Sequence, residues 1–309
     1  MKEYLIGTGG WAYFNVPRLR SLVAYSRAFN FVEVNSTFYQ IPPLKQVEGW
    51  RKLVPLDFRF GVRAHRTMIQ VAPKWEEKAL DIFERMKQIC IALGSDFLHL
   101  QLPASSKLTQ QWIDEFRSFV SSIDLGNLRL ALEIRGVRPS KLPAELLRLM
   151  QDHDIVHCTD VSKGEMPAYD SDVLYTRLFG KGEHNVYQPT DEELTEIDNK
   201  VSNSNSQKIV MSFHFVRMYK DAARLKIYEQ TGKFPKVTRS TGLSSLEEVL
   251  SEDALFPATK QELMRNQGWK IFDLNEDKRA HARYLLQNLP ERTYSNLDEV
   301  IQDLKSELG

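Results

Sequence analysis

Short apolar runs alternate with longer amphipathic segments along the first three quarters of the chain. Eight runs are rich in β-branched and aromatic residues and have the length of strands. These runs are 4–9 (YLIGTG), 31–38 (FVEVNSTF), 58–64 (FRFGVRA), 96–102 (DFLHLQL), 128–135 (LRLALEIR), 154–161 (DIVHCTDV), 173–180 (VLYTRLFG) and 208–215 (KIVMSFHF). Apolar residues between most of them recur at helical spacing, as in residues 74–93. Residues 162–171 (SKGEMPAYDS) are the exception and are expected to form a loop.

Repeated strand and helix units predict parallel strands, and eight of them favour closure into a barrel. We therefore expect an α/β fold, a TIM-like (β/α)8 barrel, over residues 1–232. The alternative is a doubly wound nucleotide-binding sheet, because residues 7–12 (GTGGWA) match the G-x-G-x-x-A pattern after a first strand. A dinucleotide site requires the helix to begin at those glycines, whereas here we expect it to begin near Pro17. This delay favours the barrel.

The pattern changes after residue 232. Residues 233–243 are polar and lack periodicity, so we interpret them as a linker. Residues 244–309 then predict a small all-helical domain, with helical runs at 244–252, 259–267, 278–289 and 296–308, the last capped by Ser295 or Asn296. A helical appendage without clustered catalytic residues is expected to be a lid or an interaction module.

Composition and charge limit the classes of partner. The 309 residues are 42% hydrophobic and 27% charged, as in a globular protein, and Cys90 and Cys158 cannot form a disulfide framework. We find neither a signal peptide nor a membrane span and expect a cytoplasmic protein. The 41 basic and 41 acidic residues balance, but residues 240–309 hold 8 basic and 13 acidic ones. The resulting positive excess of the barrel suits an anionic ligand, and nucleic acid stays open as a partner although the net charge does not indicate it.

Polar residues gather where the predicted strands end, which is where barrel enzymes place their chemistry. Strand alternation puts Glu33, Asn35 and Thr37 on one face. The catalytic candidates are Glu33, Glu133 and Asp160. The candidates for substrate binding are Trp11, Asn35, Tyr39, Arg63, His65, Gln101, Arg135 and Arg177.

The acids and arginines allow two interpretations. They could neutralise one another in a network that stabilises the barrel, because a buried charge needs a partner. Alternatively, the arginines bind a carboxylate or phosphate while a carboxylate acts as a general base. A divalent metal ion is a candidate cofactor, with Glu33, Glu133, Asp160 and His214 as its ligands. Trp11, Phe38 and Tyr39 form either an aromatic wall for a sugar ring or base, or a plug of the barrel.

Several motifs closely resemble those of the YecE-like family, domain of unknown function 72. They are GTGGW (7–11), VEVNSTFY (32–39), LQLP (100–103), LEIR (132–135), Asp160 and YTRLFG (175–180), spread over residues 3–230. The resemblance implies a TIM-like barrel and no settled activity. The chain departs from the family pattern at Ala104 (usually proline), Gly136 (usually histidine), Phe179 (usually histidine) and His214 (usually asparagine). The tail, through LFPATKQEL (255–263) and residues 285–300, resembles the domain of unknown function 2795.

We therefore expect an enzyme, possible classes being a metal-dependent hydrolase or an isomerase, that acts on an anionic small molecule or a phosphodiester. The chain has no G-x-S-x-G, H-E-x-x-H or G-K-[ST] motif, which counts against several other hydrolase classes. The alternative is a non-catalytic module that binds an anionic metabolite or nucleic acid, with the tail as its interaction element.

Overall fold

The chain folds into two compact units, which we call the barrel unit and the C-terminal unit. A computed structural model describes residues 2–70 and 77–308, so the first residues of the helix predicted at 74–93 lie outside the described residues. The barrel unit comprises the chain up to Leu178 together with Lys200–His214. The C-terminal unit comprises Phe179–Asn199 and the chain from Phe215 onward.

Eight parallel strands form the barrel, one in each run predicted from the sequence. They are β1 (Glu3–Thr8), β2 (Phe31–Val34), β3 (Arg59–Arg63), β4 (Phe97–Leu102), β5 (Arg129–Ile134), β6 (Val156–Cys158), β7 (Val173–Leu178) and β8 (Lys208–Phe213). Their order is β6-β5-β4-β3-β2-β1-β8-β7. A parallel bridge between Thr159 and Thr176 joins β6 to β7 and nearly closes the barrel. The predicted (β/α)8 architecture is confirmed, and the nucleotide-binding sheet is wrong.

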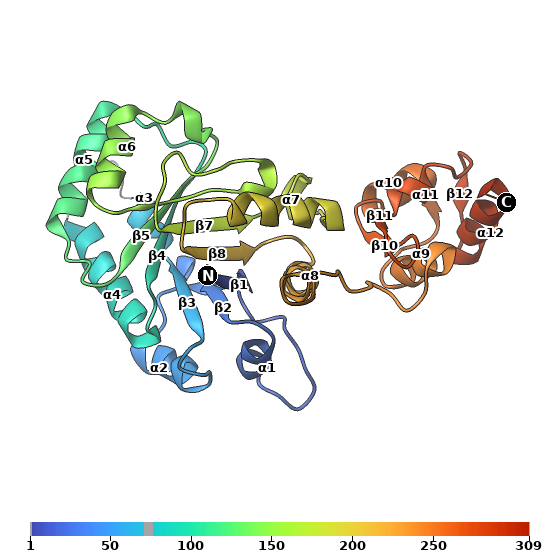
Figure 1. The fold of residues 1–309 in the computed structure, drawn as a ribbon, viewed down its shortest axis with the longest axis horizontal. Helices are drawn as coiled ribbons and strands as arrows, with labels where there is room; N and C mark the ends of the chain where they lie inside the picture. Colours follow the sequence, from blue (N-terminus) through green and yellow to red (C-terminus); the bar gives the residue numbers. More distant parts are fainter. Residues whose placement is uncertain (1, 71–76, 309) are drawn as a thin grey trace. The chain divides into compact units, whose positions relative to one another are not determined.

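Helices lie around the outside of these strands (Figure 1). They are α1 (Ser21–Ala28), α2 (Leu44–Lys52), α3 (Arg66–Gln70), α4 (Glu77–Leu93), α5 (Gln110–Ser122) and α6 (Ala144–Asp152). The first helix begins at Ser21 rather than near Pro17. The run 31–38 is a strand only to Val34, because Asn35–Phe38 turns into a 3-10 helix.

The barrel interior changes from apolar to polar toward the carboxyl ends of the strands. Its apolar layer is built from Leu5, Phe31, Phe97, Ala131, Val156, Cys158, Val173, Tyr175 and Val210. Alternate residues of a strand share a face, so a side chain two positions further along the same strand also points inward. Glu33 follows Phe31 in this way, Glu133 follows Ala131 and Arg177 follows Tyr175. The apolar layer thus supports a polar layer, which faces the end that we call the barrel mouth.

The C-terminal unit combines helices with two short antiparallel sheets. Its elements are α7 (Asp191–Ser202), most of which lies in this unit, α8 (Met218–Thr231), α9 (Gly242–Ser251), β9 (Ala258–Thr259), α10 (Lys260–Gln267), β10 (Ile271–Asp273), β11 (Arg279–His281), α11 (Arg283–Leu286), β12 (Thr293–Tyr294) and α12 (Leu297–Leu308). The helices predicted in the tail are present, but the run 278–289 divides into β11 and α11. Asn296 caps α12 by accepting a hydrogen bond from the Glu299 amide (3.0 Å). Among the described residues, no helix has the length and apolarity needed to cross a bilayer.

Gly7 permits a close approach of backbone between β1 and β2. A Cβ at this position would lie 1.9 Å from the Phe31 carbonyl oxygen. That oxygen accepts a hydrogen bond from the Tyr25 hydroxyl (2.9 Å), which in turn accepts one from the Thr8 amide (2.8 Å). We predict that Gly7→Ala lowers the free energy of unfolding by about 2–3 kcal/mol, as overpacking typically does. Urea unfolding followed by near-ultraviolet circular dichroism measures this.

The matched control is Gly49→Ala, an exposed position in α2 with no atom within 4 Å of an added Cβ. It should be neutral or raise the free energy of unfolding by up to about 1 kcal/mol, because alanine restricts the unfolded chain. Equal effects of the two substitutions would contradict the close approach at Gly7.

Candidate functional site at the barrel mouth

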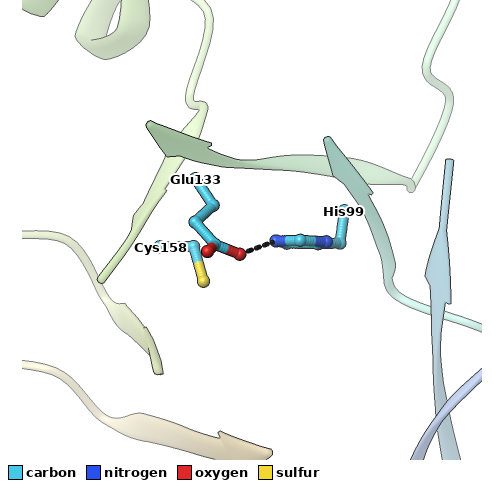
Figure 2. A group of neighbouring side chains, drawn as sticks. All are labelled: His99, Glu133 and Cys158. Carbon is cyan, nitrogen blue, oxygen red and sulfur yellow. Dashed lines mark ion pairs between the residues drawn. The ribbon is translucent and has the colours of Figure 1, made fainter. Parts of the chain in front are cut away.

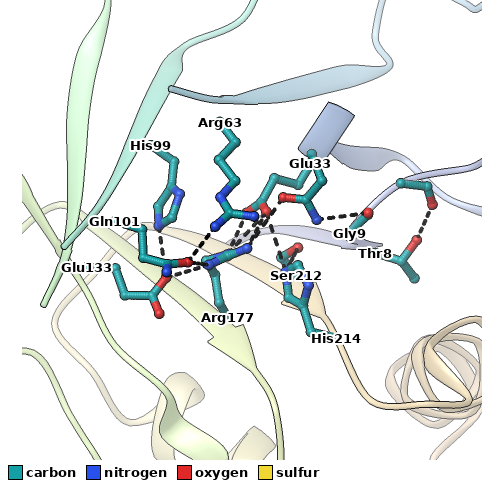
Figure 3. A network of polar contacts seen from close by, with 12 residues as sticks. Thr8, Gly9, Glu33, Arg63, His99, Gln101, Glu133, Arg177, Ser212 and His214 are labelled. Carbon is teal, nitrogen blue, oxygen red and sulfur yellow. Dashed lines mark hydrogen bonds and ion pairs between the residues drawn. The ribbon is translucent and has the colours of Figure 1, made fainter. Parts of the chain in front are cut away.

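One guanidinium group joins two carboxylates inside the barrel (Figure 3). Arg177 is only 2% exposed and donates from Nε and Nη2 to the Glu33 carboxylate, at 2.9 to 3.1 Å. Its Nη1 donates to Glu133 Oε2 and to Gln101 Oε1, the latter at 2.9 Å. The Tyr175 hydroxyl donates to Glu33 Oε2 (3.1 Å). Strands β2, β4, β5 and β7 are thereby linked through a single side chain.

The two carboxylates are held ionised by this arrangement. Burial raises the pKa of Glu33, but Arg177 and His214 lower it more, so that it lies well below the ordinary 4.5. Glu133 behaves alike: burial raises its pKa, whereas Arg177, His99 and Arg135 bring it well below 4.5. Both carboxylates therefore carry a fixed negative charge near neutral pH.

Arg63 is the cation of this cluster that lacks a carboxylate partner. Its Nη2 donates to Gln101 Oε1 (2.9 Å), and its guanidinium lies 3.8 Å from the centre of the Phe38 ring. Among the described residues, no acid pairs with it. Burial and the nearby Arg177 lower the pKa of Arg63 to about 10, which leaves it charged near neutral pH. Partial burial of a cation without an opposite charge has a desolvation cost. A carboxylate or phosphate group that paired with the guanidinium would offset this cost.

His214 lies next to Glu33 as a neutral imidazole. Burial and Arg177 lower its pKa to about 4, against the opposing effect of Glu33. Its Nε2 lies 3.0 Å from Ser212 Oγ and 3.5 Å from Glu33 Oε1. Since both contacts use the same nitrogen, the three residues do not form a serine-protease type relay, which uses both ring nitrogens.

Gly9 explains why the loop after β1 can lie against this histidine. A Cβ at Gly9 would lie 2.5 Å from His214 Nδ1 and 2.6 Å from Asn35 Nδ2. Asn35 donates instead to the Gly9 carbonyl (2.9 Å) and accepts from Arg177 (3.4 Å). The glycine-rich segment therefore packs on the site, and the helix that a dinucleotide-binding loop requires at its glycines begins only at Ser21.

Three potential metal ligands lie together in the same interior (Figure 2). Single ligand atoms of His99, Glu133 and Cys158 all lie within 4.8 Å of one another, so this group could hold a metal ion. His99 Nε2 is 3.1 Å from Glu133 Oε2, and its Nδ1 has no hydrogen-bond partner in the described part of the chain. Burial and Glu133 raise the pKa of the Cys158 thiol well above its usual range.

The metal-ligand set predicted from the sequence, Glu33, Glu133, Asp160 and His214, stays a prediction. Of its four members, Glu133 alone belongs to the cluster of His99, Glu133 and Cys158. Arg177 lies between Glu33 and Glu133, and His214 is on the Glu33 side. Asp160 accepts hydrogen bonds from the amide and hydroxyl of Ser162 in its own turn, with Lys163 at 3.8 Å.

The structure brings most of the predicted binding residues together. One network contains Glu33, Asn35, Arg63, Gln101, Glu133, Arg135, Arg177 and His214, with Arg135 Nε donating to Glu133 Oε1 (2.7 Å). Thr37 is not part of it, because it lies in the 3-10 turn and donates to the Val34 and Arg63 carbonyls.

The three remaining candidates lie in loops. Trp11 packs edge to face on Trp50 of α2, with ring centres 5.3 Å apart. Tyr39 is 65% exposed, and its carbonyl lies 3.4 Å from His65 Nε2. Of the three aromatic residues expected to form a wall, Trp11, Phe38 and Tyr39, it is Phe38 that contacts the polar network, through the guanidinium of Arg63 over its ring.

Sequence reasoning missed four residues of this interior. They are His99, Cys158, Tyr175 and Ser212. Each stands two positions before a predicted residue, namely Gln101, Asp160, Arg177 and His214. Strand alternation, applied one step further back along each strand, would have found them.

Two of the positions at which this chain departs from the family pattern, Ala104 and Gly136, lie next to each other. Gly136 has a φ of +77°, and a Cβ there would lie 2.7 Å from the Cβ of Ala104. The small residues at both positions therefore occupy one shared space next to the ends of β4 and β5.

The low pKa of His214 predicts how stability changes with pH. Between its folded pKa of about 4 and the ordinary 6.5, the unfolded chain binds a proton that the folded chain excludes. The free energy of unfolding should therefore fall as the pH drops from about 6.5 to about 4, and His214→Gln should reduce this dependence. Denaturant titrations across this range test it, with His153→Gln at the partly exposed end of α6 as the matched control. An unchanged dependence in His214→Gln would contradict the assignment.

Known proteins share this barrel. The profile of the family described as "Protein of unknown function DUF72" matches residues 5–231. UPF0759 protein YecE of Escherichia coli strain K12 is 28% identical over 180 residues, 58% of this chain and 51% of that protein, so the chain spans about half the length of the curated relatives it matches. The resemblance of the tail to the domain of unknown function 2795 stays a prediction.

Solved structures agree with the family match. Crystal structures of DUF72 family proteins from Thermotoga maritima MSB8 and Enterococcus faecalis V583 match with TM-scores of 0.60 and 0.56, at 19% and 18% identity. The matches cover 74% and 75% of this chain and 99% and 98% of the other chains, and they support the fold. With a family match over most of its length and the same barrel in its relatives, this chain belongs to the DUF72 family.

Proposed function

We propose that this protein is an enzyme that binds an anionic small molecule at the barrel mouth and transfers a proton to or from it. The observation that carries this proposal is Arg63, a largely buried guanidinium without a carboxylate partner in the described chain. The surrounding network has three guanidinium groups, of Arg63, Arg135 and Arg177, and two carboxylates, of Glu33 and Glu133. A carboxylate or phosphate group of a substrate would balance the remaining positive charge.

His214 supplies the base in this proposal. The neutral imidazole can accept a proton; burial and Arg177 oppose the imidazolium and lower the pKa of His214 to about 4, and the ionised Glu33 carboxylate 3.5 Å away offsets part of this effect. Glu33 and Glu133, which the sequence suggested as bases, serve better as fixed negative charges because Arg177 holds both ionised. Asp160 stays a candidate acid or base on the loop after β6. Abstraction of a proton next to an anionic group is the chemistry of an isomerase, which we favour over a hydrolase.

Metal-assisted hydrolysis is the second candidate, supported by the cluster of His99, Glu133 and Cys158. The charges around the cluster disfavour a divalent ion, because Arg177 donates to the Glu133 oxygen that faces His99. The metal content of untagged protein purified without chelator, measured for the wild type and for Cys158→Ser, distinguishes proton transfer from metal-assisted hydrolysis. Near-stoichiometric metal that falls in the folded variant would replace our proposal with the metal-dependent hydrolase.

Anion binding is tested first by thermal stabilisation with a panel of sugar phosphates and hydroxy acids. A ligand at 100 times its Kd should stabilise the protein by about 2.7 kcal/mol. We expect Arg63→Gln to weaken binding about 10- to 100-fold, since a charge-assisted contact is lost. Arg59→Gln, at the opposite end of β3, is the matched control and should bind as the wild type does. Equal binding by both variants would overturn the anion site.

Proton transfer is then followed by NMR as exchange of deuterium from heavy water into the bound compound. His214→Gln should retain binding and lose the exchange. Binding without exchange in the wild type would instead support the non-catalytic module, with the tail as its interaction element.

A further inference from the structure

The C-terminal unit contains a cavity of about 1080 Å³, and all the residues that line it belong to this unit. Two stretches of chain line it. The first lies within residues 181–187, and the second lies between Lys260 and Glu291. Val216 is a further lining residue. A cavity of this size suits a ligand as large as a nucleotide.

Buried contacts hold the two walls together. Gln188 is 3% exposed, and its Oε1 accepts a hydrogen bond from the Ile271 amide (3.1 Å). Its carbonyl oxygen lies 2.8 Å from Nε2 of His281. Asp191 extends the joint through an ion pair with Arg279 (3.3 Å). The cavity is therefore part of the packed unit.

Aromatic rings form the apolar part of the lining. Trp269 donates from Nε1 to the Asn266 carbonyl (2.8 Å), which fixes the plane of its indole. Tyr187 and His281 lie with ring centres 5.3 Å apart, and Met264 adds a polarizable thioether. Side chains of this kind bind planar rings by stacking and edge contacts.

The cavity lining carries four cationic side chains, of Lys181, Lys260, Arg265 and Arg283, and two carboxylates, of Glu183 and Glu291. Lys260 pairs with Glu291 (3.2 Å), and Lys181 pairs with Glu193 (2.8 Å). The exposed Arg265 and Arg283 have no carboxylate partner in the described part of the chain. Two arginines without counter-ions beside aromatic rings favour a ligand that carries both a ring and an anionic group.

We propose that this cavity binds a nucleotide, in which a planar base is joined to phosphate. Trp269 and Tyr187 contact the base, and Arg265 and Arg283 bind the phosphate. A free mononucleotide and a single-stranded nucleic acid both present a base joined to phosphate. Proteins bind single strands through aromatic side chains that stack on the bases and through cations that contact the backbone. This site is independent of the proposed activity at the barrel mouth.

Isothermal titration of the full chain with adenosine monophosphate, adenosine, inorganic phosphate and a hexadeoxyadenylate strand tests the proposal. We expect saturable binding of the mononucleotide, at least about tenfold tighter than that of adenosine or phosphate alone. Arg265→Gln, Arg283→Gln and Trp269→Leu should each weaken it about tenfold. If the strand binds more tightly than the mononucleotide, and its binding depends strongly on salt, the natural ligand is a nucleic acid. If only the mononucleotide binds, the natural ligand is a free nucleotide.

Two control variants complete the experiment. Arg85→Gln, at an exposed position of α4, should bind the mononucleotide as the wild type does, and so should Arg63→Gln at the barrel mouth. Absence of binding by both nucleotide probes, or binding that Arg265→Gln and Arg283→Gln leave unchanged, would overturn the site. Phosphate bound as tightly as the mononucleotide would overturn the role of the aromatic rings.

Discussion

The buried contact of Arg177 with Glu33 and Glu133 is the constraint on which the barrel mouth depends. Removing water from three charges is costly, and the cost is met only because each charge faces an opposite one at hydrogen-bonding distance. Loss of the Arg177 guanidinium would leave the fully buried Glu33 carboxylate without this cation, and breaking a buried ion pair costs about 3–5 kcal/mol. Burial lowers the pKa values of His214 and His99, and the positive charge of Arg177 lowers them further, so both imidazoles stay neutral near neutral pH. Structural and functional roles are thus combined in one network.

The sequence predicted the barrel because each strand carries its own signal of β-branched and aromatic residues bounded by polar turns. It predicted most of the polar network for the same reason, since strand ends are easy to locate. The pairings could not be predicted, because they depend on the stagger of strands across the barrel: Arg177 on β7 reaches Glu33 on β2, 144 residues earlier. The hydrogen bonds that the Asp160 carboxylate accepts from Ser162 of its own loop were likewise not predicted.

In the tail, the prediction was less complete because the signals are shorter. Strands β9 and β12 have two residues each, too few for any periodicity. The run 278–289 has helical composition, yet β11 forms at its start because Arg279, Ala280 and His281 pair with β10. Arg279 is then buried and pairs with Asp273 (2.9 Å), its cross-strand partner six residues earlier. Strand pairing overrode the helical propensity of this segment.

The contact between Gly136 and Ala104 has a consequence for how this sequence can change. The motif resemblance leads us to expect proline at 104 and histidine at 136. In this chain, the Cβ of a larger residue at 136 would lie 2.7 Å from the Ala104 Cβ, and that residue would have to adopt a φ of +77°. The effect of either substitution therefore depends on the residue at the other position, which is epistasis between two loops. Exchange of residues with relatives at this site requires both loops to be transplanted together, with the backbone that each one carries.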